Sequence, residues 1–256
     1  MSEAYVAFEV PTEPPVIEAG RLLLPNIGGG PGPAVVICHG SGGIDGRGAF
    51  HSARLNEAGI ATLEIDLWAA RGTARGPAAR PASPLLTLPD AYAARRYLAS
   101  QPEIDADRIG VLGFSWGGVM SLLAARAPAS PDSVFAAHAA LYPVCWAYQG
   151  VPDLALDRLT GKPILILTGE TDAYDRPGAG AALARFLRTR PGGELVRQVE
   201  YAGAGHGFDR GGRPAQIIFD PFAHQGQGGE VLMAFHAEAA SAAREEVARF
   251  FAEALG

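Results

Sequence analysis

Short runs of apolar and β-branched residues alternate along this chain with longer segments in which apolar residues recur every three or four positions. The short runs predict buried strands, and the longer segments predict helices. The expected strands, of which the first two would form an antiparallel edge, are residues 6–10, 21–24, 34–38, 60–65, 108–112, 134–141, 164–167 and 196–201. The expected helices are residues 49–58, 89–100, a segment that follows the turn at 113–118 and ends at 125, 180–188 and 232–255.

This alternation of strands and helices predicts the α/β class. Right-handed crossovers would build a mostly parallel central sheet with helices on both faces, a three-layer α/β/α sandwich. Polar and glycine-rich segments follow the carboxyl ends of several expected strands, where open α/β sheets bind their ligands. No internal repeat or long linker divides the chain, so we expect residues 1–256 to form a single domain.

Composition narrows the function classes. The chain has 48% hydrophobic and 19% charged residues, as in ordinary globular proteins, and a net charge of −6, which argues against a broad nucleic-acid-binding face. No apolar run is long enough to span a membrane, and residues 1–15 lack the features of a signal peptide, so we expect a cytoplasmic protein. Two cysteines make no disulfide framework, and no metal-binding motif is present. We therefore expect no cofactor and no metal.

The most informative motif is Gly113-Phe-Ser115-Trp-Gly117. A nucleophile on a sharp strand-to-helix turn needs small residues two positions before and after it, because strand and helix pass close together there. In a chain with 33 glycines the motif alone is weak evidence, and a glycine-rich helix start without chemistry is the alternative. Its position directly after an apolar strand and before an apolar helix favours Ser115 as a nucleophile.

Two further strand ends carry the partners that such a serine needs. Asp172 follows the strand 164–167, and His206 lies in a glycine-rich loop after the strand 196–201. The order Ser, Asp, His along the chain is typical of a triad on an α/β sheet, with His206 as general base and Asp172 as the acid that orients it. Two nearby carboxylates, Glu170 and Asp175, are alternatives to Asp172 as the acid. The other loop histidine, His224, is the alternative to His206 as the base.

A second glycine-rich segment, His39-Gly-Ser41-Gly-Gly, follows the strand 34–38. It lacks the Gly-Lys-Ser/Thr ending of a phosphate-binding loop. We expect it to supply one oxyanion donor from the backbone N–H of Ser41, or alternatively of Gly40. The N–H of Trp116, at the start of the helix after Ser115, would supply the other.

Together with Leu-Glu-Ile-Asp66 and Arg108-Ile-Gly-Val-Leu-Gly, these motifs resemble the dienelactone hydrolase family of α/β-hydrolases, from about residue 34 to the C-terminus. The resemblance implies a cap-less α/β-hydrolase domain that cleaves small esters or lactones without a cofactor. Two departures stand out: the founding members use a cysteine nucleophile where this chain has Ser115, and a glutamate where it has His39. The resemblance therefore points to a serine esterase branch rather than to dienelactone itself as substrate.

We thus expect a hydrolase of small-molecule esters or lactones that acts through an acyl-enzyme, with no nucleic-acid or membrane partner, as a monomer or a homodimer. Acyl transfer or thioester hydrolysis by the same triad is an alternative, and a non-catalytic binding protein on this scaffold is another. The aromatic residues near motifs that would line the substrate site are Trp68, Trp146, Tyr148 and Phe208.

Two loops complete the expected site. The loop 69–84 carries Arg71, Arg75 and Arg80, for which solvated side chains are the expectation and a clamp for a substrate carboxylate the alternative. The segment 210–230 is longer than the family's usual connection and rich in Gly, Pro and aromatic residues. We expect it to fold over the mouth of the active site.

Overall fold

The computed structural model describes the whole chain except residues 27, 29 and 128–130. The large sheet contains β1 (Ser2–Val10), β2 (Val16–Leu24), β3 (Gly32–Cys38), β4 (Ala61–Ile65), β5 (Ile104–Phe114), β6 (His138–Leu141), β7 (Ile164–Gly169) and β8 (Val196–Tyr201). A separate hairpin consists of β9 (Gln216–Asp220) and β10 (Gly229–Met233). The helices are α1 (Arg47–Glu57), α2 (Leu88–Ala99), α3 (Trp116–Ala124), α5 (Ala179–Arg188) and α7 (Ala237–Leu255). Short helical turns are η1 (Ala69–Arg71), η2 (Pro84–Leu86), η3 (Pro131–Ser133), α4 (Ala147–Gly150), η4 (Pro152–Leu154) and α6 (Ala223–Gly226).

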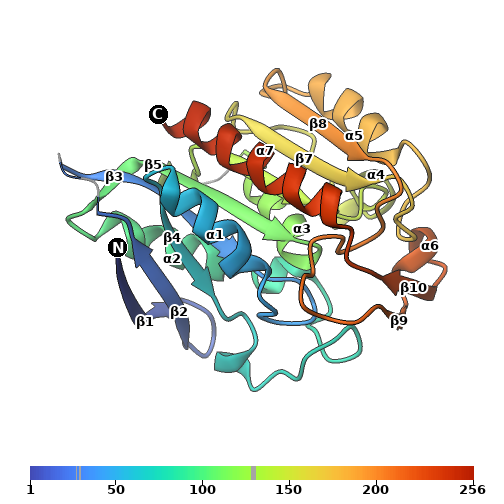
Figure 1. The fold of residues 1–256 in the computed structure, drawn as a ribbon, viewed down its shortest axis with the longest axis horizontal. Helices are drawn as coiled ribbons and strands as arrows, with labels where there is room; N and C mark the ends of the chain where they lie inside the picture. Colours follow the sequence, from blue (N-terminus) through green and yellow to red (C-terminus); the bar gives the residue numbers. More distant parts are fainter. Residues whose placement is uncertain (27, 29, 128–130) are drawn as a thin grey trace.

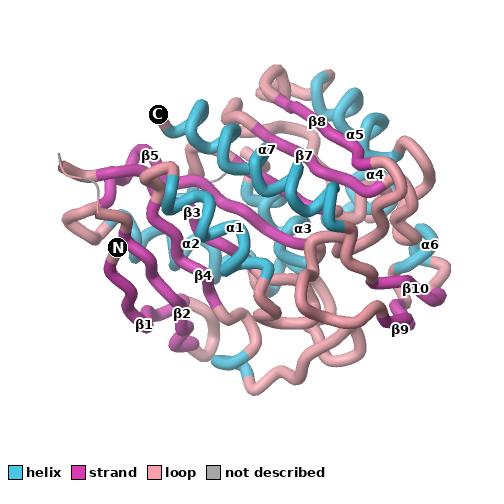
Figure 2. Tube along the Cα trace, in the orientation of Figure 1, coloured by secondary structure: helices cyan, strands magenta, loops and turns pink. Residues whose placement is uncertain are grey.

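The strand order in the sheet is β1-β2-β4-β3-β5-β6-β7-β8 (Figure 1). The first two strands form the expected antiparallel edge, and all pairings from β4 through β8 are parallel. Each parallel crossover passes over a face of the sheet, and the polar motifs follow the strand ends at one edge, where the long loops gather (Figure 2). This confirms the predicted α/β class and the mostly parallel sheet.

Two apolar clusters hold the layers together. One joins α2, α3 and α5 to one face of the sheet, and the other joins α1 and α7 to the opposite face, which is the near face in Figure 1. The central strands bury both faces, as the side chains of β3 from Ala34 to Cys38 are fully inaccessible to solvent. Burial on both sides explains why these strands appear in the sequence as continuous apolar runs.

Several predicted boundaries are wrong. Three strands, β1, β2 and β5, begin four or five residues earlier than expected. The strand expected at 134–141 begins only at His138, which is the first residue that pairs with both β5 and β7. Phe135 lies before the strand and stacks on Tyr92 of α2. The helix expected at 232–255 begins at Ala237, because residues 232 and 233 pair with β9 in the hairpin. His236 caps this helix, its side chain accepting a hydrogen bond from Ala239 N.

Among the described residues, no helix has both the length and the apolar character needed to cross a bilayer.

Candidate active site

The turn after β5 places Ser115 where strand and helix meet. Ser115 has φ 51° and ψ −109°, a backbone conformation that L-residues rarely adopt. A Cβ on Gly113 would lie 1.9 Å from Gly117 O, and a Cβ on Gly117 would lie 2.1 Å from Cys38 O. Both positions therefore exclude any side chain, which is the steric condition for holding the serine at the apex.

The structure brings together the three side chains that the motif order predicts. His206 Nε2 lies 2.8 Å from Ser115 Oγ, and His206 Nδ1 lies 2.8 Å from Asp172 Oδ2. Asp172 Oδ1 accepts a further hydrogen bond from Tyr174 N, which fixes the carboxylate. The imidazole and the carboxylate are both buried, whereas Ser115 opens to a cavity.

The rival residues are engaged elsewhere. Asp175 accepts hydrogen bonds from the backbone N–H groups of Cys145 and Trp146, and Glu170 accepts one from Gly203 N. The ring of His224 lies beside Glu230 O in the β9–β10 hairpin. Burial raises the pKa of Asp175, the nearby Asp172 carboxylate adding to the effect. None of these contacts links a rival to Ser115.

The expected oxyanion donors lie beside Ser115. Trp116 is the first residue of α3, so its N–H has no partner within the helix. In the loop after β3, a Cβ on Gly40 would lie 3.4 Å from Ser115 Cβ, so this loop passes directly over the nucleophile. Ser41 is held there from two directions: its carbonyl accepts from Trp68 Nε1, and its Oγ accepts from Arg80 Nη1.

His39 anchors the same loop from behind. Its Nε2 accepts a hydrogen bond from Leu67 N at 3.0 Å, so Nδ1 carries the proton and donates to Gly40 O at 2.7 Å. His39 is buried, and these two hydrogen bonds fix the backbone of the expected oxyanion loop, residues 39–43.

Two tyrosines that the motifs did not predict enclose the imidazole of His206. The Tyr174 ring centroid lies 4.2 Å from that of His206, and the Tyr142 ring contacts it edge-on at 4.8 Å. Each tyrosine hydroxyl donates to a buried aspartate, Tyr142 to Asp209 and Tyr174 to Asp220. Their positions are the signal in the sequence that could have found them, because Tyr142 directly follows β6 and Tyr174 comes two residues after Asp172.

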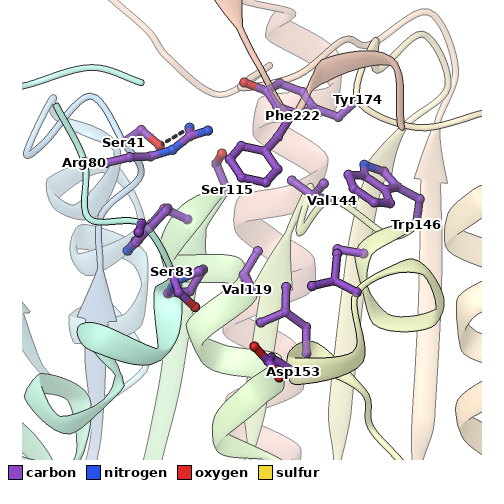
Figure 3. Close-up of a pocket in the computed structure, with 16 residues that line it drawn as sticks. Ser41, Arg80, Ser83, Ser115, Val119, Val144, Trp146, Asp153, Tyr174 and Phe222 are labelled. Carbon is purple, nitrogen blue, oxygen red and sulfur yellow. Dashed lines mark hydrogen bonds between the residues drawn. The ribbon is translucent and has the colours of Figure 1, made fainter. Parts of the chain in front are cut away.

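A cavity of about 200 Å³ extends from Ser115 (Figure 3). Its walls are mostly apolar. The residues that line it are Ser41, Arg80, Ala82, Ser83, Pro84, Ser115, Trp116, Val119, Val144, Trp146, Ala147, Val151, Asp153, Leu154, Tyr174 and Phe222. Phe222 comes from the segment 210–230, which the structure thus places at the cavity.

Of the four aromatic residues expected to contact substrate, only Trp146 lines this cavity. Trp68 packs behind the oxyanion loop, with its ring against His39 and Trp116. Tyr148 is buried in the core and donates to Pro143 O, and Phe208 packs against tyrosine rings in the cluster on the α1–α7 face. Proximity in sequence to a motif did not distinguish the cavity wall from the layers behind it.

Two of the loop arginines are not solvated, contrary to expectation. Arg80 forms a bidentate pair with Asp220, and Arg71 pairs with Asp90 at 2.8 Å. Their side chains are 8% and 16% exposed, since the loop folds back onto the protein. Arg75 is exposed, and its side chain lies over Gly43.

Comparison with known proteins identifies the family of this chain. The model of the Dienelactone hydrolase family matches residues 19–255. An uncharacterized protein of Mycobacterium tuberculosis is 29% identical over 199 residues, which are 73% of this chain and 67% of that protein. A probable 2-oxo-3-(5-oxofuran-2-ylidene)propanoate lactonase of a Bradyrhizobium species is 35% identical over 122 residues, 47% of this chain and 48% of that one.

Among solved structures, a dienelactone hydrolase-like promiscuous phosphotriesterase from metagenomic libraries superposes over 100% of both chains with a TM-score of 0.68 and 19% identity. A dienelactone hydrolase from Anabaena variabilis covers 100% of this chain and 99% of its own, with a TM-score of 0.60 and 20% identity. These likenesses establish the shared α/β-hydrolase fold. Because the family model matches residues 19–255, nearly the whole chain, this chain belongs to the dienelactone hydrolase family.

Proposed function

We propose that this protein is a serine hydrolase that cleaves small carboxylic esters or lactones through an acyl-enzyme. Its family and fold support a hydrolase. The observation that carries the finer assignment is the continuous relay from Ser115 Oγ through His206 to Asp172, with 2.8 Å at each step, on a turn whose glycines admit no side chain.

The geometry supports the following steps. Ser115 Oγ attacks the ester carbonyl carbon while His206 Nε2 takes its proton, and Asp172 stabilises the imidazolium and holds its tautomer. The N–H groups of Trp116 and of Ser41 or Gly40 receive the negative charge on the carbonyl oxygen. His206 returns the proton to the alcohol oxygen as the ester C–O bond breaks, which leaves the acyl group on Ser115. A water molecule that gives its proton to His206 then attacks the acyl carbon, and the proton passes to Ser115 Oγ as the acid is released.

The cavity limits the size of the substrate. An apolar cavity of roughly 150 Å³ is large enough to bind benzene. The cavity beside Ser115, at about 200 Å³, therefore has room for one aromatic ring or a short acyl chain. We expect small aryl or alkyl esters to be cleaved faster than long-chain esters.

A thiol nucleophile has little support here. Cys38 is fully buried in β3 and Cys145 is 3% exposed. Burial raises the pKa of both thiols, and neighbouring carboxylates add to the effect, Asp90 and Glu18 at Cys38 and Asp175 and Asp172 at Cys145. We expect neither cysteine to take part in the reaction.

Labelling and substitution test the proposal together. A fluorophosphonate probe should label Ser115, and Ser115→Ala and His206→Ala should each lower kcat by about four orders of magnitude or more on small 4-nitrophenyl esters. Ser100→Ala, at an exposed helix end, is the matched control and should retain wild-type activity. Iodoacetamide should leave activity intact.

The acid is tested by a second pair of variants. Asp172→Asn should lose nearly as much activity as His206→Ala, whereas Asp175→Asn should retain most of it. An active Asp172→Asn beside an inactive Asp175→Asn would show that the acid is misassigned. Full activity in Ser115→Ala, or protection from iodoacetamide inactivation by substrate, would exclude the mechanism.

A further inference from the structure

Arg80 is the cationic side chain in the cavity wall, close to the oxyanion loop. Its guanidinium lies between two aromatic rings, with the carbon 5.5 Å from the centroid of Trp116 and 5.1 Å from that of Phe222. Its Nη1 donates to Ser41 Oγ at 3.0 Å, as the dashed line in Figure 3 marks. A guanidinium in this position would ordinarily serve to bind a carboxylate on the substrate.

The carboxylate of Asp220, at the end of β9, already accepts the hydrogen bonds that this guanidinium could donate to a substrate. Its two oxygens accept from Arg80 Nη1 at 2.7 Å and Nη2 at 2.8 Å, the bidentate geometry that a substrate carboxylate would use. Phe222 N and Tyr174 OH donate to the same carboxylate, so it receives four hydrogen bonds while fully buried. Burial alone would raise the pKa of Asp220, but these hydrogen bonds hold it below the usual value, so the charge on Arg80 is balanced at neutral pH.

The far end of the cavity carries a negative charge. Asp153 lines the cavity and appears in Figure 3 at the end away from Ser115, with Val119 between them. Its carbonyl accepts from Arg126, while its side chain is exposed. With Arg80 balanced by Asp220, the remaining charged side chain of the lining is Asp153, while Arg126, which bonds the Asp153 carbonyl, is not part of the lining.

We propose that Asp220 and Asp153 determine specificity, so that the cavity accepts the uncharged part of an ester and rejects one that bears a carboxylate. The inference rests on the proposed ester hydrolysis and names its substrate class: neutral esters or lactones. A carboxylate entering the cavity would lose its water without gaining the Arg80 donors, and it would approach Asp153.

Two pairs of esters test the inference, and each pair has a neutral and an anionic member of similar shape. One pair varies the charge on the acyl side and the other on the alcohol side, so the test holds whichever side enters the cavity. The acyl pair is 4-nitrophenyl heptanoate and mono-4-nitrophenyl adipate, whose carboxylate is too far from the ester carbonyl for fast self-cleavage. The alcohol pair is 4-methylphenyl butanoate and 4-carboxyphenyl butanoate. We expect wild-type kcat/KM to favour the neutral member by at least about tenfold in one pair or both.

Substitutions at the ion pair should shift this ratio in opposite directions. Asp220→Asn frees the Arg80 guanidinium to bind a carboxylate, so the neutral-to-anionic ratio should fall about tenfold. Arg80→Met leaves Asp220 unbalanced, so the ratio should rise. Asp153→Asn should lower the ratio by a smaller factor, because Asp153 is exposed and its charge is screened. Asp157→Asn, exposed and outside the cavity lining, removes the same charge and should leave the ratio unchanged.

The ratio separates charge selection from general damage, since a distorted active site slows both members of a pair alike. A wild type that cleaves both members of both pairs equally would overturn the inference. Asp220→Asn and Arg80→Met shifting the ratio in the same direction, or Asp157→Asn shifting it as much as Asp220→Asn, would also overturn it. In any of these cases the proposed ester hydrolysis would still stand if a fluorophosphonate labels Ser115 and neutral esters are cleaved. If Ser115 is not labelled and neutral esters are not cleaved, both the proposed function and this inference fail.

Discussion

The two sides of the His206 imidazole are built alike but placed differently. On each side a tyrosine ring contacts His206, and its hydroxyl donates to a buried aspartate that lies close to an arginine. On the core side, Tyr142 OH also accepts from Arg47 Nη1 at 2.9 Å, and Arg47 forms a bidentate pair with Asp45. This core-side network is completed by His51, whose Nε2 lies 2.9 Å from Asp209.

The other side, formed by Tyr174, Asp220 and Arg80, faces the cavity instead of the core; it is called the insert side because Asp220 belongs to the segment 210–230. Its arginine, Arg80, lines the cavity, and its aspartate, Asp220, belongs to the β9–β10 hairpin, which packs on the body through the small cluster around Tyr174. The core-side groups have no share in the cavity lining. The difference indicates that the core side fixes the position of the base, while the insert side couples that position to the shape and charge of the substrate site.

Removing the arginine of each side should have the largest effect and should separate their roles. Arg47→Met removes the bidentate partner of buried Asp45, which keeps only Arg210 Nε at 3.2 Å, and it removes the hydrogen bond to Tyr142 OH. Breaking this buried pair should cost about 3–5 kcal/mol and lower Tm by roughly 10 °C. Arg80→Met should lower Tm less, because the hairpin can open locally without unfolding the sheet. Differential scanning calorimetry measures both.

The matched control for Arg47 is Arg54→Met on the same helix. Arg54 forms exposed ion pairs with Glu57 and Glu245, which are worth about 1 kcal/mol at most. Limited proteolysis should cleave the 210–230 segment faster in Arg80→Met than in Arg47→Met at temperatures below unfolding. Equal losses of Tm in Arg47→Met and Arg54→Met would show that the core-side network contributes no special stability.

Removing a single hydroxyl from each tyrosine sharpens the comparison with a smaller effect. Tyr142→Phe leaves both Arg47 and Asp209 with an unmet partner inside the core, at a cost of about 1–3 kcal/mol. Tyr174→Phe removes one of four donors to Asp220, so we expect about 1 kcal/mol or less. Urea unfolding with an unchanged m-value measures the difference, and a larger loss in Tyr174→Phe would reverse the assignment of the two sides.

Asp209 and Asp220 should differ from a second group of buried carboxyls in how their contribution to the free energy of unfolding changes with pH. Burial alone would raise the pKa values of Asp209 and Asp220, but hydrogen bonds from His51 and Arg80 respectively hold them below the usual value. Their contribution to stability is therefore present above the unfolded pKa and lost as the pH falls below about 4. Both sides of His206 should thus remain intact at neutral and alkaline pH.

Glu18 and Asp90, which lie near Cys38 at the end of β3, should behave in the opposite way. Burial, reinforced by Asp90, raises the pKa of Glu18 to about 8, and burial raises the pKa of Asp90 to about 6. Because the folded state holds these protons more tightly than the unfolded state, stability falls as the pH rises from about 4.5 to 8. We expect the highest Tm near pH 5, and Glu18→Gln should flatten the decline from pH 5 to 8. A wild-type Tm that climbs steadily over that range would contradict this.

The sequence by itself determined the fold class and the residues proposed for the relay. Apolar runs identify strands buried on both faces, and parallel strands end at the same edge of a sheet, so motifs after β5, β7 and β8 had to converge. The glycines around Ser115 signalled the turn because the close approach of Gly113 and Gly117 excludes every other residue type. These features depend on a few neighbouring residues, which is why the local pattern reveals them.

Only the tertiary structure decided what surrounds that relay. The partner of Arg80 lies 140 positions away in a hairpin, the last two residues of which, 232 and 233, the apolar pattern assigned to the last helix. Trp68, Trp146, Tyr148 and Phe208 all follow motifs, yet only one of them lines the cavity. The physical reason is that periodicity shows whether a side chain is buried but not against which layer, and that ion pairs between loops depend on how the whole chain folds.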